Sequence, residues 1–437
     1  MPQRTAHKSI NIHGETGITE IFPDKSLSHR SIILPAISEG VSEISNLLEG
    51  DDVLHTIDAM RLAGVKIEKE GKKWLIYGKG LNSLLEPSAH LYLGNSGTSA
   101  RLLAGVFAPY HFPVFFTGDA SLSKRPMNRA FKPLREMGVE FLATSRNTAP
   151  FYMKGGDIMP IEWQMEVASA QVKSAILLAS CQIQGRTTII ENTKTRDHTE
   201  NMLKNAGGDI SIYDNKITIN GGKALQKHNI TIPNDPSSSA FLIAVAILCE
   251  NSSITIRNVC INKTRAGFFY ALKQMNANIQ FTNIKTVAGE DVADINASYS
   301  PDIQGIQLNG DIAPSMIDEY PILFVIASFA NGVSIFEGLK ELTAKESNRL
   351  KIMAENLTEI GVQCNVNYED PSLQIIGNPT FAPKSTKPIP THFDHRIAMS
   401  CLIAGLRGKV TIDDDTYIKT SFPNFIDIIK NIGCCIS

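Results

Sequence analysis

Apolar runs recur along the chain at a nearly constant spacing, and small polar residues of the kind that start helices precede each of them. Ser, Thr and Asp accept hydrogen bonds from the first unpaired backbone N–H groups of a helix. Six segments fit this pattern and are predicted to be helices: 26–36, 98–107, 169–179, 237–248, 318–330 and 394–406. Their starts lie roughly 70 to 80 residues apart, which predicts an internal repeat.

A second series of predicted helices alternates with the first. These helices end near Gly or Asn, residues that suit a left-handed C-cap, at Gly64, Gly138, Gly207, Asn276, Gly361 and Gly433. Short alternating or β-branched runs such as 66–68, 74–77 and 209–213 follow most of them and are predicted to be strands. Each repeat therefore reads as two helices and several short strands, an α/β unit too small to be stable without its neighbours.

Two prolines interrupt the chain at its middle, within 232–236. Proline prevents a helix or a central strand from running through this point. Three repeats lie on either side, so we predict two similar lobes with a cleft between them. A predicted strand near 9–13 suits either lobe.

Composition narrows the class of protein. The 437 residues are 43% hydrophobic and 20% charged, with a formal net charge of -2. Such a balance is typical of a soluble globular protein and argues against general binding to nucleic acid or to a membrane. The longest apolar run, 240–249, is shorter than the roughly 18 residues of a transmembrane helix. We expect a cytoplasmic protein.

The seven cysteines show no spacing typical of a zinc site. Most of them lie in apolar runs, so free and largely buried thiols are predicted, and no metal ligand cluster is expected.

The candidate functional residues lie mainly at the predicted helix starts. A helix N-terminus carries unpaired N–H groups and a partial positive charge, so a nearby cation completes a site for an anion. The segment 94–101 is a Gly-rich turn that enters a helix, and a side chain at Gly97 would intrude on a bound anion. Neither GxxxxGK[ST] nor GxGxxG occurs, so a nucleotide loop is not predicted.

Other charged or polar helix starts are 23–30, 117–127, 169–173, 195–200, 316–321, 345–349 and 393–396. Capping, a solvated loop or a surface salt bridge explains each one taken singly. Lys345 and Arg349 are expected on one face of a helix because they are four residues apart. Since these starts recur at similar places in a repeated unit, we expect them to form one anion-binding surface.

Several phrases along the chain resemble one family, the 5-enolpyruvylshikimate-3-phosphate (EPSP) synthases. They are DKSLSHR, GNSGTSARLL, TGDASLSKRPM, SAQVKSAILLA, TRDHTE, DEYP, KESNRL and DHRIAMS, in this order. The resemblance implies two inside-out α/β barrels, each of three βαβαββ repeats around buried parallel helices. It implies one discontinuous domain, 1–20 with 239–437, and a second domain, 21–238, with the active site between them.

The resemblance also implies residue roles. The residues that resemble contacts to shikimate 3-phosphate are Lys25, Ser26, Arg30, Ser169, Ala170, Gln171, Arg196, Asp318 and Lys345. Those that resemble contacts to phosphoenolpyruvate are Lys25, Asn95, Gly97, Arg125, Gln171, Arg349 and Arg396. Asp318, Glu346 and Lys25 match the catalytic positions.

The implied reaction transfers an enolpyruvyl group to the 5-hydroxyl by addition and then elimination, without metal or cofactor. We expect Glu346 to exchange the proton at the methylene carbon and Asp318 to act on the hydroxyl. Lys25 would stabilise charge or shuttle a proton. Gly97 is associated in this family with inhibition by glyphosate, so inhibition competitive with phosphoenolpyruvate is expected, and the family suggests a monomer.

The chain departs from the family pattern in places. Ala170 stands where many members have serine, Asn348 where aspartate is commoner, and Leu102 where some have proline. Arg196 belongs to a variant seen within the family, and Thr420 is in register with a lysine that Lys419 would have to replace.

Two alternatives stay open at this point. The sister enzyme that uses UDP-N-acetylglucosamine has a reactive loop cysteine, and the corresponding loop here, 117–126, contains none. A noncatalytic relative would be expected to lack the carboxylates, whereas Asp318 and Glu346 are both present.

Overall fold

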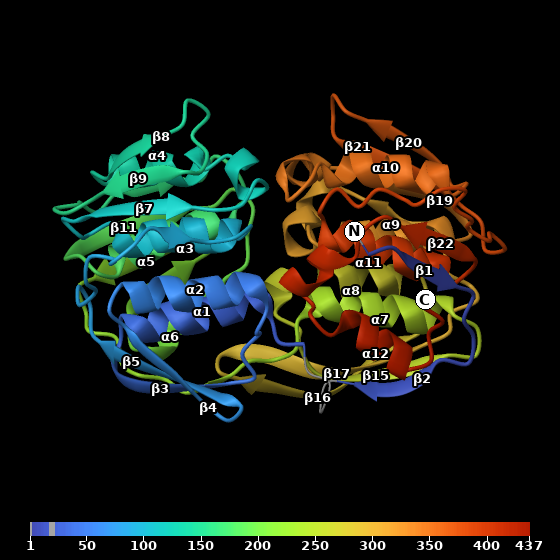
Figure 1. The fold of residues 1–437 in the computed structure, drawn as a ribbon, viewed down its shortest axis with the longest axis horizontal. Helices are drawn as coiled ribbons and strands as arrows, with labels where there is room; N and C mark the ends of the chain where they lie inside the picture. The colour runs from blue at the N-terminus through green and yellow to red at the C-terminus, as the bar shows by residue number, and fades with distance from the viewer. Residues whose placement is uncertain (1, 17–21) are drawn as a thin grey trace. The chain divides into compact units, whose positions relative to one another are not determined.

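The computed structural model describes residues 2–16 and 22–437. The chain divides into two compact units (Figure 1). Unit 1 comprises Met1–Phe22, Pro233–Lys285 and Asp291–Ser437, and unit 2 comprises Pro23–Ile232 and Thr286–Glu290. The division at 232/233 falls at the first of the two central prolines, just before Asp235 caps the next helix and Pro236 begins it. The expected boundary at 238/239 would instead cut this helix, which is continuous.

Unit 2 contains three sheets with the same strand order. They are β14-β3-β5-β4, β6-β7-β9-β8 and β10-β11-β13-β12. In each sheet the first two strands are parallel and the remaining neighbours are antiparallel. The strands are β3 (Glu39–Ser45), β4 (Lys66–Glu70), β5 (Lys73–Lys79), β6 (Leu91–Tyr92), β7 (Pro113–Thr117), β8 (Glu140–Ala143), β9 (Phe151–Lys154), β10 (Glu162–Gln164), β11 (Gly185–Ile190), β12 (Asp209–Tyr213), β13 (Lys216–Gly221) and β14 (Ile230–Thr231).

Unit 1 repeats this order in β2-β15-β17-β16 and β18-β19-β21-β20. Its third sheet is assembled from both ends of the chain: β1 pairs antiparallel with β22, and isolated bridges add Lys384 and Ile389 on one side and Ile436 on the other. The strands are β1 (Arg4–His7), β2 (His13–Thr16), β15 (Ser253–Cys260), β16 (Ile279–Val287), β17 (Glu290–Ser298), β18 (Gln307–Leu308), β19 (Gly332–Phe336), β20 (Gln363–Asn367), β21 (Ser372–Gly377) and β22 (Lys409–Ile412).

Two edge strands pair in a different unit from the helix that follows them in the chain. β2 precedes the first helix of unit 2 in sequence but pairs with β15 of unit 1, and β14 precedes the first long helix of unit 1 but pairs with β3 of unit 2. The single strand predicted near 9–13 is wrong in its bounds, since most of that segment lies between β1 and β2, and both of these strands belong to unit 1. Unit 1 is discontinuous because β1 and β2 pair with β22 and β15 from the second half of the chain.

Each unit encloses three helices that are buried on nearly all sides. In unit 2 they are α1 (Lys25–Ala36), α3 (Gly97–Phe107) and α5 (Ala170–Ser180), and in unit 1 they are α7 (Pro236–Leu248), α9 (Tyr320–Ser328) and α11 (His395–Gly405). Their apolar or small residues on every face suit full burial. α3 packs against α5 and α1, and α7, α9 and α11 pack against one another.

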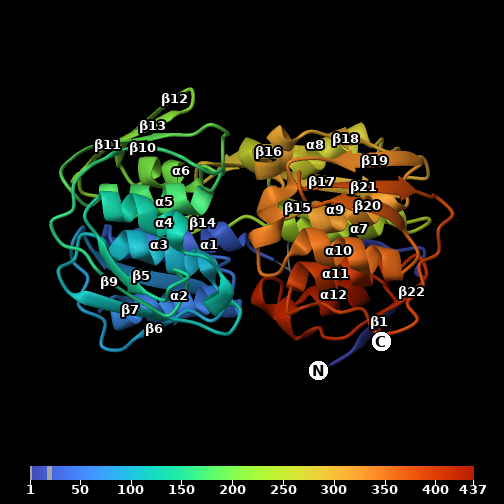
Figure 2. The same ribbon diagram turned by 90° about the horizontal axis from the view of Figure 1, so that it is seen from above.

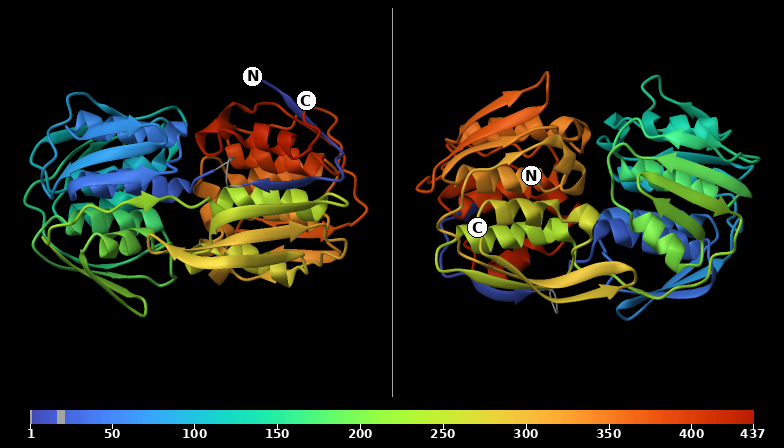
Figure 3. Two further views of the ribbon diagram at one scale, coloured as in Figure 1. Left: turned by 90° about the horizontal axis from the view of Figure 1, so that it is seen from below. Right: turned by 180° about the vertical axis from the view of Figure 1, so that it is seen from behind.

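The other helices are less buried than these six. They are α2 (Asp51–Leu62), α4 (Asn128–Glu136), α6 (His198–Asn205), α8 (Gly267–Gln274), α10 (Arg349–Glu359) and α12 (Phe425–Asn431). Short 3-10 turns are η1 (Leu122–Lys124), η2 (Lys263–Arg265), η3 (Gly310–Ser315), η4 (Leu339–Ala344) and η5 (Thr416–Thr420). In each unit the sheets lie outside the central helices (Figures 2 and 3), which is the inside-out α/β arrangement expected from the resemblance.

One local prediction is wrong. Lys345 and Arg349 do not share a helix face, because η4 ends at Ala344 and α10 begins at Arg349. Asn348 is the N-cap of α10, and its side chain accepts a hydrogen bond from the Lys351 backbone N–H at 3.1 Å. The predicted helix from Asp318 similarly begins later, at Tyr320.

Candidate active site

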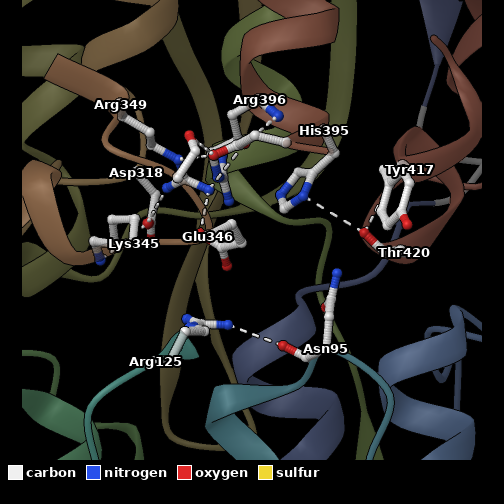
Figure 4. Close-up of polar contacts among 12 residues, drawn as sticks. Asn95, Arg125, Asp318, Lys345, Glu346, Arg349, His395, Arg396, Tyr417 and Thr420 are labelled. Carbon is white, nitrogen blue, oxygen red and sulfur yellow. Dashed lines mark hydrogen bonds and ion pairs between the residues drawn. The ribbon is translucent and has the colours of Figure 1, made fainter. Parts of the chain in front are cut away.

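The Gly-rich turn of unit 2 brings two guanidinium groups close to the start of α3. Ser96 caps this helix by accepting a hydrogen bond from the Ser99 N–H at 3.2 Å. A Cβ atom at Gly97 would lie 2.8 Å from Nη1 of Arg101 and 2.8 Å from Cζ of Arg125. Arg125 Nη1 donates to the Asn95 carbonyl at 2.9 Å (Figure 4). Glycine is therefore required for the cations to approach the helix start.

A carboxamide connects the starts of α3 and α5. Gln171 accepts a hydrogen bond from Arg101 Nη1 at 2.7 Å and donates one to Thr98 Oγ1 at 2.8 Å. Ser169 caps α5 through its side-chain oxygen, and Ala170 is the first helical residue. Two helix N-termini with adjacent cations therefore lie together, which is an arrangement that favours anions.

Arg30 lies on α1 and is only 3% exposed. Its guanidinium donates to Thr199 Oγ1 at 2.7 Å, to Ser174 Oγ at 2.7 Å and to the Ser26 carbonyl at 3.0 Å. Burial lowers the pKa of Arg30 to about 10. A buried guanidinium whose hydrogen bonds with described residues go to neutral acceptors would gain from a bound anion.

Two more predicted cations of unit 2 lie at helix starts. Lys25 is the first residue of α1 and forms an ion pair with Asp52 of α2. Arg196 is half-buried and precedes Asp197, the N-cap of α6.

Arg349 organises the predicted residues of unit 1 (Figure 4). It is 1% exposed, and three carboxylates accept its hydrogen bonds: Asp394 at 2.9 Å, Asp318 at 3.2 Å and Glu346 at 2.6 Å. Asp318 lies between η3 and α9, and Glu346 lies between η4 and α10. The guanidinium thus fixes the orientation of both carboxylates that match catalytic positions.

Asp394 is a component that the sequence-based assignment omitted. It is fully buried, accepts hydrogen bonds from Ser347 Oγ at 2.9 Å and from the Arg396 N–H at 2.9 Å, and caps α11. Burial alone would raise the pKa of Asp394, but Arg349 holds it below its ordinary value. The same carboxylates hold the pKa of Arg349 above its ordinary value despite burial. Asp394 could have been found in the phrase FDHR, but a carboxylate before a helix is also explained by N-capping.

Lys345 and Arg396 complete this group. Lys345 Nζ lies 3.3 Å from Asp318 Oδ1, so this carboxylate contacts two cations. Arg396 is 9% exposed in the first turn of α11.

Thr420 and Lys419 differ in burial. Thr420 is buried, donates to the Tyr417 carbonyl at 2.8 Å and lies 3.5 Å from Nδ1 of His395 (Figure 4). Lys419 is exposed. The position in register with the family lysine is thus occupied by a buried hydroxyl. The exposure of Lys419 gives no support to the idea that its ammonium replaces that lysine.

Five of the seven cysteines are buried, as predicted. Among residues 2–16 and 22–437, no group of three or more His, Cys, Asp or Glu side chains is placed to hold a metal ion. No helix in the described part of the chain is long and apolar enough to cross a membrane.

The fold is that of the enolpyruvyl transferases. The solved structure of the enolpyruvyl transferase NikO from Streptomyces tendae matches with a TM-score of 0.76 over 100% of this chain and 98% of that chain, at 16% sequence identity, a likeness that shows the fold alone. Within this class, the chain belongs to the EPSP synthase family: the model of EPSP synthase (3-phosphoshikimate 1-carboxyvinyltransferase) matches residues 11–429.

Individual relatives agree. A 3-phosphoshikimate 1-carboxyvinyltransferase of Pseudomonas sp. (strain PG2982) is 44% identical over 99% of this chain and 97% of its own length. One from Brucella abortus biovar 1 (strain 9-941) is 44% identical over 97% of this chain and 95% of its own. The EPSP synthase structure from Acinetobacter baumannii matches with a TM-score of 0.86 and 40% identity, over 100% and 99% of the two chains. The predicted family is confirmed.

Proposed function

We propose that this chain carries out the reaction of its family at the two groups of residues described above. The reaction transfers the enolpyruvyl group of phosphoenolpyruvate to the 5-hydroxyl of shikimate 3-phosphate and releases phosphate. The observation that carries the proposal is the cluster around Arg349, which orients Asp318 and Glu346 in a chain that matches the EPSP synthase family from residue 11 to 429. Carboxylates held in this way suit proton transfer.

Shikimate 3-phosphate is assigned to Lys25, Ser26, Arg30, Ser169, Ala170, Gln171, Arg196, Asp318 and Lys345. The support comes from charge and burial. Arg30 offers a buried guanidinium with neutral hydrogen-bond partners, and the capped start of α5 adds a helix N-terminus. A phosphate would offset the cost of burying the Arg30 charge.

Phosphoenolpyruvate is assigned to Lys25, Asn95, Gly97, Arg125, Gln171, Arg349 and Arg396. Gly97 provides space between Arg101 and Arg125. Arg349 is the hardest of these residues to assign to substrate, because its N–H groups already donate to three carboxylates. It reaches the substrate only if a carboxylate, most simply Glu346, gives up its hydrogen bond.

The chemistry follows as addition and elimination. A proton is added to the methylene carbon of phosphoenolpyruvate while the 5-hydroxyl oxygen bonds to its C2 and loses its own proton. The resulting tetrahedral ketal phosphate then loses a proton from the new methyl group and expels phosphate. We assign the proton exchange at carbon to Glu346, the hydroxyl proton to Asp318, and charge stabilisation or proton shuttling to Lys25.

The experiment that tests the proposal is phosphate release by the purified protein. Release should require both shikimate 3-phosphate and phosphoenolpyruvate and should accompany formation of the enolpyruvyl ether. Each substrate alone is the control. Saturable binding of shikimate 3-phosphate without phosphate release would support a noncatalytic relative, and failure to bind either substrate would refute the proposal.

Glyphosate inhibition is a further test of the phosphoenolpyruvate assignment. We propose that glyphosate competes with phosphoenolpyruvate beside Gly97. Inhibition that does not change with phosphoenolpyruvate concentration would contradict this assignment. The monomeric state, which the family resemblance suggests, and the cytoplasmic location, which the composition suggests, remain predictions.

A further inference from the structure

An ammonium group that the proposed mechanism does not use lies deep inside unit 2. Lys173 belongs to the first turns of α5 and is only 1% exposed. Its Nζ lies 3.0 Å from Glu191 Oε2, 2.6 Å from Glu200 Oε1 and 3.4 Å from the Thr195 carbonyl oxygen. Instead of facing an anion at the helix start, as its place in the motif suggested, this lysine faces two buried carboxylates.

The cluster has a high electrostatic cost. Burial alone would lower the pKa of Lys173, but Glu200 and Glu191 raise it above its ordinary value. Burial raises the pKa of Glu200 in spite of the nearby ammonium. Buried ion pairs contribute little net stability compared with apolar residues of similar size, but they fix the geometry of the groups that they join.

The cluster holds the loop that connects β11 to α6. Glu191 Oε1 accepts hydrogen bonds from the Thr195 N–H at 3.2 Å and from Thr195 Oγ1 at 2.5 Å. Lys173 donates to the carbonyl of the same threonine. Thr195 is therefore held through its backbone and its side chain, and Arg196 is the next residue along the chain.

The residue after Lys173 holds a second candidate phosphate ligand. Ser174 Oγ lies 2.7 Å from Thr199 Oγ1 and accepts a hydrogen bond from Arg30 Nη2 at 2.7 Å. Thr199 also accepts from Arg30 Nε at 2.7 Å and precedes Glu200 on α6. Consecutive residues of α5 thus hold the Arg196 loop and the Arg30 guanidinium, on the helix that begins beside Ser169 and Gln171.

We propose that Lys173 is a positioning residue for shikimate 3-phosphate: through Thr195 and Glu200 it sets Arg196 and Arg30 in register with the start of α5. The proposal rests on the proposed role of these residues in binding this substrate. Lys173 itself does not touch the substrate. Its loss therefore affects the affinity for shikimate 3-phosphate more than the affinity for phosphoenolpyruvate, because displacement of a ligating group by about 1 Å is costly.

The test measures the Kd for shikimate 3-phosphate by calorimetry and the KM for each substrate. Lys173→Met removes the ammonium, and the double variant Lys173→Met/Glu200→Gln removes a carboxylate charge as well. Both should raise the Kd for shikimate 3-phosphate about 10-fold or more and leave the KM for phosphoenolpyruvate within about twofold. Equal effects on both substrates would overturn the proposal.

Gln182 supplies the control for a loss of stability alone. It is 2% exposed just beyond the C-terminal end of α5, where its Nε2 donates to the carbonyls of Val106 and Leu178, both at 2.9 Å. Gln182→Leu should destabilise unit 2 but leave the Kd for shikimate 3-phosphate unchanged. If it raises this Kd as much as the Lys173 variants do, the role of Lys173 is merely structural.

A milder variant decides the question if the Lys173 variants do not fold. Thr195→Val removes the 2.5 Å hydrogen bond to Glu191 without leaving a charge unpaired. It should raise the Kd for shikimate 3-phosphate several-fold, and an unchanged Kd would overturn the proposal.

Arg196→Met separates this proposal from the assignment on which it rests. If that variant binds shikimate 3-phosphate normally, the substrate assignment fails. If it loses affinity while the Lys173 and Thr195 variants do not, only the positioning role fails.

Discussion

A buried arginine in each unit shows how similar repeats support different chemistry. Arg30 of unit 2 donates to two hydroxyls and a carbonyl, whereas Arg349 of unit 1 donates to three carboxylates. Burial lowers the pKa of Arg30 to about 10. For Arg349, burial also acts to lower the pKa, but Asp394, Glu346 and Asp318 raise it above its ordinary value.

The difference indicates what each group can do. A buried cation that donates its hydrogen bonds to neutral acceptors carries a desolvation cost that nearby carboxylates such as Glu200 offset only in part, so a bound anion would stabilise Arg30 further. The charge of Arg349 is already balanced by carboxylates, so its proposed contact with phosphoenolpyruvate requires one of them to give up a hydrogen bond, while the others stay oriented by the guanidinium. In the proposed function, cations of both units bind anions, and unit 1 also supplies the carboxylates Asp318 and Glu346.

The largest expected effect is on turnover in Glu346→Gln. The amide cannot exchange a proton with the methylene carbon, so kcat should fall about 100-fold or more. The Kd for shikimate 3-phosphate should stay within about twofold, because its assigned ligands are unchanged. Full activity in this variant would refute the catalytic assignment. Glu355→Gln, at an exposed position of α10 beside Lys351, is the matched control and should be fully active.

The next effect compares the two arginines directly by urea unfolding. Arg349→Met leaves three carboxylates without their shared cation and should destabilise unit 1 by about 3 to 5 kcal/mol. Arg30→Met removes hydrogen bonds to neutral groups together with a buried charge and should cost only about 1 kcal/mol.

Arg30→Met should nevertheless weaken binding of shikimate 3-phosphate, since it removes a proposed phosphate ligand. Equal losses of stability in the two variants would show that their different partners do not matter, and the contrast between the units would fail.

Gly97→Ala should give a smaller and more selective effect. The added methyl group would lie 2.8 Å from Arg125 Cζ and from Arg101 Nη1, so both guanidinium groups must shift. We expect the KM for phosphoenolpyruvate to rise about 10-fold and glyphosate inhibition to weaken. The Kd for shikimate 3-phosphate serves as the internal control and should barely change. If only the Kd for shikimate 3-phosphate changed, Gly97 would belong to the shikimate 3-phosphate site and its assignment to phosphoenolpyruvate would be wrong.

The smallest expected effect is a pH dependence of opposite sign at two buried carboxyls. The pKa of Asp394 is lowered in the folded protein by Arg349, which outweighs burial. Its contribution to stability is therefore complete above the unfolded pKa of about 3.9 and is lost as the pH falls through the folded pKa.

Burial raises the pKa of Glu200, so the folded protein binds this proton more readily than the unfolded chain does. The free energy of unfolding should therefore increase as the pH falls through the raised pKa of Glu200 to the unfolded value of about 4.3, because protonation removes a buried charge. The measurement is the urea midpoint of unfolding as a function of pH. In Asp394→Asn, the decrease in midpoint that Asp394 causes at acid pH should disappear. In Glu200→Gln, the increase that protonation of Glu200 causes should disappear. If these variants have the same pH profile as the parent, the two assignments are wrong.

Local sequence signals predicted the buried helices closely. Segments 26–36 and 237–248 became α1 (Lys25–Ala36) and α7 (Pro236–Leu248), because caps at Asp24 and Asp235 and continuous apolar runs act within a few residues. The same local logic failed at Lys345 and Arg349, where Asn348 caps a new helix instead of continuing one.

By itself, the sequence determined the repeat, the helix starts and the cations placed beside them, since capping and periodicity depend on near neighbours in the chain. Only the tertiary structure decided which partners these groups meet. Arg349 meets Asp394, 45 residues away, Lys173 contacts Glu191 and Glu200, and β2 and β14 each pair in the unit that does not contain the next long helix of the chain. The physical reason is that burial and pairing of charges depend on contacts between distant segments, which local sequence patterns do not encode.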